Sequence, residues 1–293
     1  MALSKKEWFE LETFAADLRD LTIDTVNWAG SGHWGGSSSS ADIVTLIYRK
    51  FAKFDPKNPE DPDRDRVVVS KGHVGILLAP LFSLLGLIEK EQLKTFNLTG
   101  SKLGIHLDSN KVKGLDSSTG SLGHGSSLAL GMALAGALKG QTYKTFLVLG
   151  DGECDEGSVW EAAMATSHFA KRGGKNVITI VDRNHNMIDG NTEDVMALEP
   201  FADKWKAFGF ETVVVNGHDI PALAEAIERA YKGDGDKPYC IIADTIKGEG
   251  VSFAAGNYKW HYGALNEEKY NTAKADLAAF RAKRLERVNK EGK

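Results

Sequence analysis

Five short apolar runs alternate with longer helical segments along the 293-residue chain. They are RVVVS at 66–70, KTFLVLG at 144–150, NVITIVD at 176–182, ETVVV at 211–215 and YCIIADT at 239–245. Runs of this length and composition suit strands that are buried on both faces, and the helices between them provide the crossover connections of parallel strands. The alternation predicts an α/β fold, with a doubly wound, mainly parallel sheet and helices on both faces.

Helices are expected around and between these runs. Apolar periodicity indicates a helix over 6–29. Residues 30–40, GSGHWGGSSSS, are expected to form a loop that leads into a helix from about Ala41. The most apolar segment, VGILLAPLFSLLGLI at 74–88, is too short for a membrane span, so we expect a buried helix there.

Composition and charge exclude several classes of protein. The net charge of −4 gives no basic footprint for nucleic acid, and the N-terminus lacks the apolar core of a signal peptide. Cys154 and Cys240 have no paired spacing, which favours a cytoplasmic protein without disulfides, bound to no membrane. We predict one domain over residues 1–265 and a charged helical tail of the same domain over 266–293, with its charged face in solvent.

Polar residues follow two consecutive predicted strands. Asp151 lies between Gly150 and Gly152 at the end of one strand, and Asn184 follows the next strand in DRNHNMIDG. Ligands of doubly wound sheets bind beyond the carboxyl ends of the strands, so we expect these side chains to lie together. Their oxygens, with a nearby backbone carbonyl, suit Mg²⁺ bound to a diphosphate, and the glycines allow the backbone to approach it closely. Either motif alone would be consistent with a solvated turn.

The GDG segment followed by this asparagine resembles the thiamine-diphosphate-binding motif. The resemblance implies that Asp151, Asn184 and the main-chain carbonyl of Asn186 hold the Mg²⁺ that grips the diphosphate. It becomes specific to transketolases through five histidines in glycine-containing loops: His33 in SGHWGG, His73 in SKGHVG, His106 in GIHLD, His124 in SLGHG and His261 in KWHYG. These matches extend from residue 31 to residue 263.

The resemblance also implies roles for individual residues. The expected catalytic residues, which contact the sugar, are His33, His106 and His261. The expected cofactor-binding residues are His73, Gly120, Ser121, Leu122, Gly152, Glu156, Asn184, Lys247 and His261. Glu156 matches an acid at the family's subunit interface. Trp34, the serines at 37–40 and the residues after His106 differ from the family's usual residues where the sugar is expected, so the sequence does not fix whether the substrate is phosphorylated, sulfonated or bare.

The resemblance implies half of an enzyme. In this family a glutamate from a second α/β domain activates the pyrimidine ring of the cofactor, and no such domain follows in this sequence. We therefore expect the N-terminal subunit of a split transketolase, whose C-terminal partner subunit supplies the pyrimidine-binding domain and the activating glutamate, in an α2β2 assembly. The expected reaction is the transfer of a two-carbon ketol unit from a ketose to an aldose acceptor.

Three other functions are left open. The first is another thiamine-diphosphate enzyme subunit, such as one similar to 1-deoxyxylulose-5-phosphate synthase. The number of glycine-loop histidines disfavours a ketoacid decarboxylase. The second is a non-catalytic module that binds thiamine diphosphate, although a scaffold would need no sugar-side histidines. The third is a nucleotide-binding α/β protein, which the lack of a G-K-S/T loop at a helix start disfavours.

Overall fold

The computed structural model describes residues 3–292, and in that range the strands form one parallel sheet in the order β1-β2-β3-β5-β4. The bounds are β1 (Arg66–Val69), β2 (Thr145–Gly150), β3 (Val177–Arg183), β4 (Glu211–Asn216) and β5 (Tyr239–Asp244). Each predicted run forms a strand whose ends lie within one residue of the expected bounds. The predicted parallel α/β sheet is confirmed.

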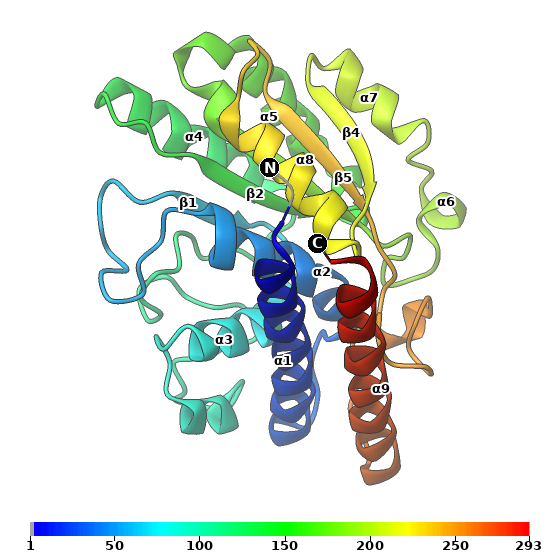
Figure 1. Ribbon diagram of the computed structural model, residues 1–293. Helices are drawn as coiled ribbons and strands as arrows, with labels where there is room; N and C mark the ends of the chain where they lie inside the picture. Colours follow the sequence, from blue (N-terminus) through cyan, green and yellow to red (C-terminus); the bar gives the residue numbers. More distant parts are fainter. Residues whose placement is uncertain (1–2, 293) are drawn as a thin grey trace.

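Helices cover both faces of the sheet (Figure 1). Their bounds are α1 (Lys5–Ala29), α2 (Gly35–Leu46), α3 (Gly75–Leu84), α4 (His124–Leu138), α5 (Gly157–His168), α6 (Thr192–Val195), α7 (Phe201–Ala207), α8 (Ile220–Lys232) and α9 (Glu267–Glu291). Alternate strand residues point to opposite layers. In β2, Phe146 packs with α1, α2 and α8, whereas Leu147 packs with α4, α5 and α7.

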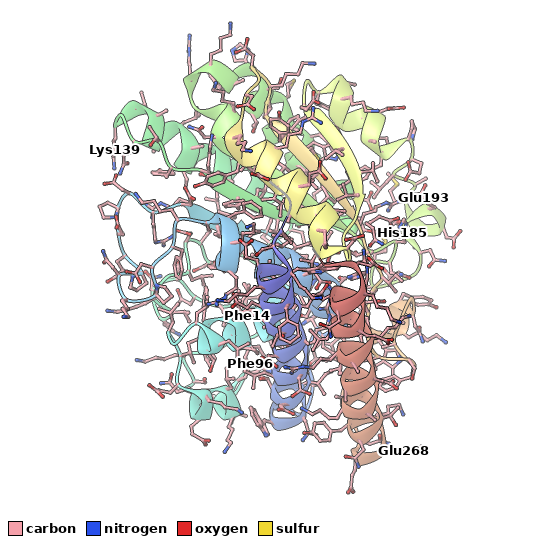
Figure 2. The ribbon with its side chains drawn as sticks, in the orientation of Figure 1. Phe14, Phe96, Lys139, His185, Glu193 and Glu268 are labelled. Atoms are coloured by element: carbon pink, nitrogen blue, oxygen red, sulfur yellow. The ribbon has the colours of Figure 1, made fainter. Side chains whose placement is uncertain are left out.

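The predicted buried helix is α3, whose residues from Gly75 to Phe82 are buried. It belongs to the same apolar core as α1, where Phe14 and Phe96 mark the region in Figure 2. Within residues 3–292, every helix is either too short or too polar to cross a bilayer.

The start of α2 corrects the sequence prediction. Residues 35–40 were expected in a loop, yet they form the first part of a buried helix. The hydroxyls of Ser37 and Ser40 donate to the carbonyl oxygens of His33 and Gly36, at 2.7 and 3.0 Å. Each buried hydroxyl therefore has a hydrogen-bond partner four residues earlier in the chain. Serine has a weak helix propensity, and burial against the sheet overrides it here.

The expectation that the charged tail faces solvent is wrong for its inner side. Helix α9 lies beside α1 in Figure 1 and runs antiparallel to it. Near one end Lys274 pairs with Asp24 at 2.8 Å. Towards the other end Arg284, only 11% exposed, pairs with Glu12 and with Asp42 of α2. Charge complementarity with α1 therefore attaches the tail to the domain.

Candidate functional site

A cavity of about 400 Å³ lies beyond the carboxyl ends of β2 and β3. The predicted residues that line it come from distant parts of the chain: His33, His73, Gly120, Leu122, Asp151, Gly152, Asn184, Asn186, Lys247 and His261. His185 and Glu193, which follow β3, mark this end of the sheet in Figure 2. A larger open hollow of about 930 Å³, bordered by the loop at 56–60 and residues 98–103, contains none of the predicted site residues.

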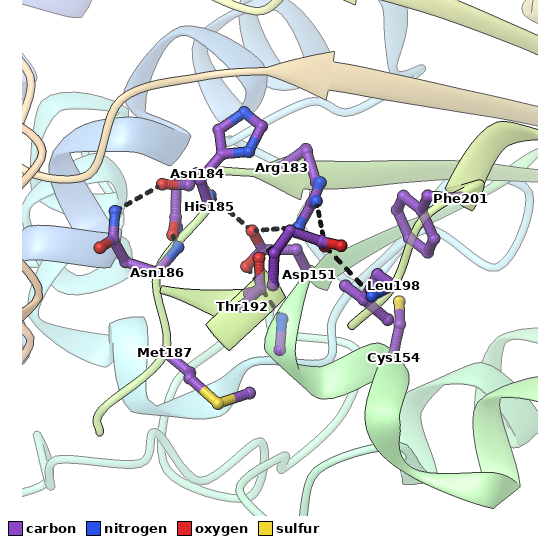
Figure 3. Close-up of polar contacts among 12 residues, drawn as sticks. Asp151, Cys154, Arg183, Asn184, His185, Asn186, Met187, Thr192, Leu198 and Phe201 are labelled. Atoms are coloured by element: carbon purple, nitrogen blue, oxygen red, sulfur yellow. Dashed lines mark hydrogen bonds and ion pairs between the residues drawn. The ribbon is translucent and has the colours of Figure 1, made fainter. Parts of the chain in front are cut away.

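Asp151 is held rigidly at the end of β2 (Figure 3). One carboxylate oxygen accepts from the amide of Gly152 at 2.9 Å, and the other accepts from the amide of His185 at 2.6 Å. The Arg183 guanidinium lies 3.4 Å from the second oxygen. Burial and the neighbouring carboxylate of Asp182 raise the pKa of Asp151 in spite of this arginine. A bound cation would stabilise the ionised form of this carboxylate, which burial and Asp182 disfavour.

The loop after β3 adds neutral oxygen atoms to the same wall. The amide nitrogen of Asn184 donates to the Ser39 hydroxyl at 3.3 Å, and this orients its Oδ1, which accepts from the Asn186 amide at 3.2 Å. The carbonyl of Asn186 accepts from Lys247 Nζ at 2.9 Å. The buried Oδ1 of Asn186 has no hydrogen-bond partner among the residues that the structure describes. Hard oxygen atoms therefore converge here, with one left unsatisfied.

A cation site at this wall needs amide and carbonyl oxygens in addition to the Asp151 carboxylate. Across residues 3–292 no group of three or more histidine, cysteine, aspartate or glutamate side chains is placed to hold a metal ion. The predicted set has one carboxylate, one amide oxygen and one carbonyl oxygen. Mg²⁺ accepts oxygen ligands of these kinds alongside water and phosphate oxygens.

Three imidazoles face one another across the cavity. The ring centroids of His33, His73 and His261 lie 5.2–5.3 Å apart. Burial, followed by the positive charge of nearby groups, lowers the pKa of His33 to about 4 and that of His261 to about 3. The same causes hold the pKa of His73 well below its ordinary value. All three rings are therefore neutral at pH 7.

Lys247 fixes the tautomer of His261. Its ammonium lies 3.0 Å from Nδ1 of His261, and an ammonium only donates hydrogen bonds. Nδ1 must then accept, so the neutral ring carries its proton on Nε2. Burial lowers the pKa of Lys247 to about 8, which keeps it mostly protonated at pH 7. The contact gives His261 an N–H donor on the nitrogen that faces away from the lysine.

Three predicted residues lie at the rim and do not line the cavity. His106 is exposed, and its ring packs over Gly120, where an added β-carbon would lie 2.9 Å from it. Ser121 is exposed, as is Glu156, which lies against the backbone of Gly123. All three side chains are exposed in this chain.

Two of the positions that were expected beside the sugar have a different role. Trp34 is fully buried and packs against Phe253 and Trp260, with ring centroids 6.0 and 5.3 Å away. The serines at 37–40 are buried within α2. These side chains are buried and do not line the cavity, so they cannot select the substrate by direct contact.

Sequence reasoning missed four buried charged residues around the cavity. The ammonium of Lys71 pairs with the fully buried Asp182, and Arg183 pairs with Asp151. Glu153 accepts hydrogen bonds from three separate segments. One signal was available: charged residues at the ends of apolar runs, as in VVVSK and VITIVDR, are costly unless they are paired.

Comparison with known proteins agrees with this geometry. The family described as "Transketolase, thiamine diphosphate binding domain" matches residues 11–287. The chain belongs to the transketolase family. Its domain is the one that binds thiamine diphosphate in that family, and the fold is the family's fold.

Curated relatives and solved structures differ in how much of their length the chain covers. The 6-deoxy-6-sulfo-D-fructose transketolase subunit SqwG of Clostridium sp. (strain MSTE9) is 40% identical over 93% of this chain and 98% of its own. A subunit of the apulose-4-phosphate transketolase of Phocaeicola vulgatus is 36% identical over 96% and 97%. A transketolase from Campylobacter jejuni superposes with a TM-score of 0.84 at 31% identity, over 96% of this chain but only 46% of that one.

Proposed function

We propose that this chain is the cofactor-holding subunit of a two-chain transketolase, which transfers a two-carbon ketol unit from a ketose to an aldose. The observation that carries the proposal is the convergence of the Asp151 and Asn184 oxygens with three neutral imidazoles in one cavity. One set suits a cation and a diphosphate, and the other suits sugar hydroxyls. Two buried free cysteines fit our placement of the protein in the cytoplasm.

The residues present fit thiamine diphosphate and Mg²⁺. Asp151, Asn184 and the carbonyl of Asn186 would hold the metal ion, and the unsatisfied Oδ1 of Asn186 supports a ligand at this wall. Lys247 and His73 border the same space and would meet the diphosphate. At Gly36 an added β-carbon would lie 3.9 Å from Nε2 of His73, so its lack of a side chain leaves room between helix α2 and the histidine.

When bound, thiamine diphosphate supplies the electron sink for breaking and forming the carbon–carbon bond. The chain's own groups bind and orient. Nε2–H of His261 donates a hydrogen bond to a substrate oxygen, because Lys247 occupies the other ring nitrogen. The His33 ring lines the same cavity and would lie beside the substrate. A neutral ring can also accept a proton from a substrate hydroxyl and later return it, or stabilise the developing oxyanion through its N–H.

A partner would supply the glutamate that activates the pyrimidine ring. The glutamate that lines the cavity in the described part of the chain is Glu153, and its carboxylate is already bonded to two backbone amides and a hydroxyl. Relatives that align over nearly their whole length are named subunits, and the solved transketolases are more than twice as long. Both observations support a separate C-terminal subunit. We propose that the two chains form an α2β2 assembly.

The names of these relatives also guide the choice of substrate. One is named for a sulfonated ketose and another for a sugar phosphate, so we propose a ketose donor with an anionic substituent far from the reacting carbon. The groups that read the anion would belong to the partner, because the positive charges in this cavity lie on the diphosphate side, at Lys71 and Lys247.

The decisive experiment combines this chain with candidate partner chains encoded nearby, and measures ketol transfer with thiamine diphosphate and Mg²⁺. We expect activity only when both chains are present. Activity of the chain alone would overturn the split enzyme. Partner-dependent decarboxylation would support the deoxyxylulose-phosphate-synthase-like alternative, and cofactor binding without turnover with any partner would support a non-catalytic module.

A further inference from the structure

Glu153 joins three segments that form the walls of the cavity. It is 3% exposed and lies in the single turn Gly152–Asp155 that follows Asp151. Its Oε1 accepts from the amide of Gly123 at 2.8 Å and from the hydroxyl of Ser70. Its Oε2 accepts from the amide of Gly150 at 3.0 Å. One carboxylate therefore bonds to the end of β2, the residue after β1 and the loop before α4.

Each bonded segment leads directly into predicted site residues. Gly150 precedes Asp151 and Gly152, and Ser70 lies three residues before His73. These two segments border the part of the cavity proposed for the diphosphate. Gly123 follows residues 120–122, which border the part proposed for the cofactor rings. Glu153 thus lies at the junction between the two halves of the proposed cofactor site.

The loop before α4 depends on such an anchor. Gly123 has φ +81, and a β-carbon there would lie 2.3 Å from the Ser158 hydroxyl. At Gly125 a β-carbon would lie 2.4 Å from the Ser70 hydroxyl, which also accepts from the Gly125 amide at 3.2 Å. Glycines allow this close approach, but they also leave the loop conformationally free unless other groups hold it. The carboxylate of Glu153 and the Ser70 hydroxyl are those groups.

We infer that Glu153 is a positioning residue that fixes the ring-binding loop at 120–122 against the diphosphate-binding turn at 150–152. This inference rests on the proposed function of the cavity. It leads to a specific consequence, because a ligand that spans both halves benefits from their fixed separation, whereas inorganic pyrophosphate occupies only one half. Loss of the anchor must then weaken thiamine diphosphate more than pyrophosphate.

The test compares the full-length wild-type chain with Glu153→Gln and Glu153→Ala. The glutamine is nearly isosteric, but its amide group must face one of the N–H donors. Calorimetry gives the Kd of thiamine diphosphate and of inorganic pyrophosphate, both with Mg²⁺. We expect about a tenfold loss for thiamine diphosphate and about threefold or less for pyrophosphate. Glu161→Gln, an exposed substitution on α5, is the matched control and should change neither constant.

Amide hydrogen exchange tests the anchor without any ligand. The Gly123 amide should exchange at least about tenfold faster in Glu153→Ala, whereas amides within β3 should keep their protection. Unchanged exchange at Gly123 in Glu153→Ala, or equal losses for the two ligands, would overturn the inference. Failure of the wild-type chain to bind thiamine diphosphate both alone and together with its partner subunit would instead overturn the proposed function, whereas exchange at Gly123 would still decide whether this carboxylate holds the loop.

Discussion

At the scale of single residues, the cavity combines a buried carboxylate of raised pKa with neutral imidazole rings and buried ammonium groups. The pKa of Asp151 is raised by burial, and the pKa values of His33 and His261 are lowered by it. Each shift moves a group towards its neutral form, which is what a water-poor site does to ionisable side chains. A bound divalent cation would favour the ionised form of Asp151, and a bound diphosphate would favour the protonated form of the imidazoles.

Asp151→Asn tests the cation site. Mg²⁺-dependent binding of thiamine diphosphate should weaken by on the order of 100-fold, because the substitution removes the only charged ligand of the proposed set. The free energy of unfolding should stay the same or rise, since a buried carboxylate with a raised pKa is removed while Arg183 keeps Glu193 and Glu199. Calorimetry and urea unfolding measure the two effects.

The matched control for this substitution is Asp203→Asn, on the exposed surface of α7, where the carboxylate pairs only with Lys206 at 3.0 Å in the described structure. It should leave binding unchanged. Wild-type affinity of Asp151→Asn for the Mg²⁺ complex of the cofactor would contradict the metal assignment.

Lys71→Met tests the ion pair beneath the cavity. Asp182 is fully buried and also accepts hydrogen bonds from Ser39 and Ser40, each at 2.7 Å. Burial acts to raise the pKa of Asp182, but the Lys71 ammonium and the hydroxyls bring it below its ordinary value. Removal of the ammonium alone should lower the free energy of unfolding by about 3–5 kcal/mol.

The double variant Lys71→Met with Asp182→Asn serves as the control, because it removes both charges. It should be more stable than Lys71→Met in urea unfolding, since no uncompensated charge remains. A single variant as stable as wild type would mean that the pair is not a buried charge pair in solution.

At the scale of secondary-structure elements, nearby residues set where a helix begins and ends, whereas charged residues far away in the sequence attach helix α9. Helix α8 begins after Asp219, whose carboxylate accepts from the Ala222 amide at 3.3 Å, and ends at Gly233 with φ +61. These signals are local, so the sequence predicts them. The attachment of α9 depends on acids of α1 and α2 more than 200 residues away, and the sequence does not indicate which side of α9 they meet.

Arg284→Ala tests that attachment. The substitution leaves the buried Glu12 with only its hydrogen bond from the Trp8 indole and removes one ion-pair partner of Asp42, so the free energy of unfolding should fall by about 3 kcal/mol. Lys283→Ala, the neighbouring exposed position, should change it by less than about 0.5 kcal/mol. Equal effects of the two substitutions in urea unfolding would show that α9 is held by something other than this ion cluster.

At the scale of the whole molecule, the buried imidazoles make stability depend on pH. In the unfolded chain these histidines take up protons below about pH 6.5, whereas in the folded chain His33 does so only near 4 and His261 only near 3. The unfolded state therefore binds more protons as the pH falls from 6.5, and the free energy of unfolding decreases in that window. Saturating pyrophosphate should reduce the decrease, since an anion favours protonated rings.

Chemical unfolding at several pH values between about 4.5 and 7.5 measures this dependence. His33→Asn combined with His261→Asn provides the control, and its stability should vary less over the same range than that of the wild-type chain. A wild-type profile as flat as that of the double variant would mean that these rings titrate normally in the folded protein.

The sequence by itself determined the five strands, their parallel arrangement and the position of Asp151 and Asn184 at one edge of the sheet, while the other predicted residues of the cavity came from the resemblance to transketolases. It could do so because apolar runs, glycine turns and capping residues act over a few neighbours, and because carboxyl ends of parallel strands share one edge. Only the tertiary structure decided that residues 35–40 are helical, that Trp34 is fully buried, that Lys71 and Arg183 pair with Asp182 and Asp151, and that Glu153 bonds to the amide of Gly123. Burial and pairing are set by segments that meet after folding, and no local pattern records which partner a charge will find.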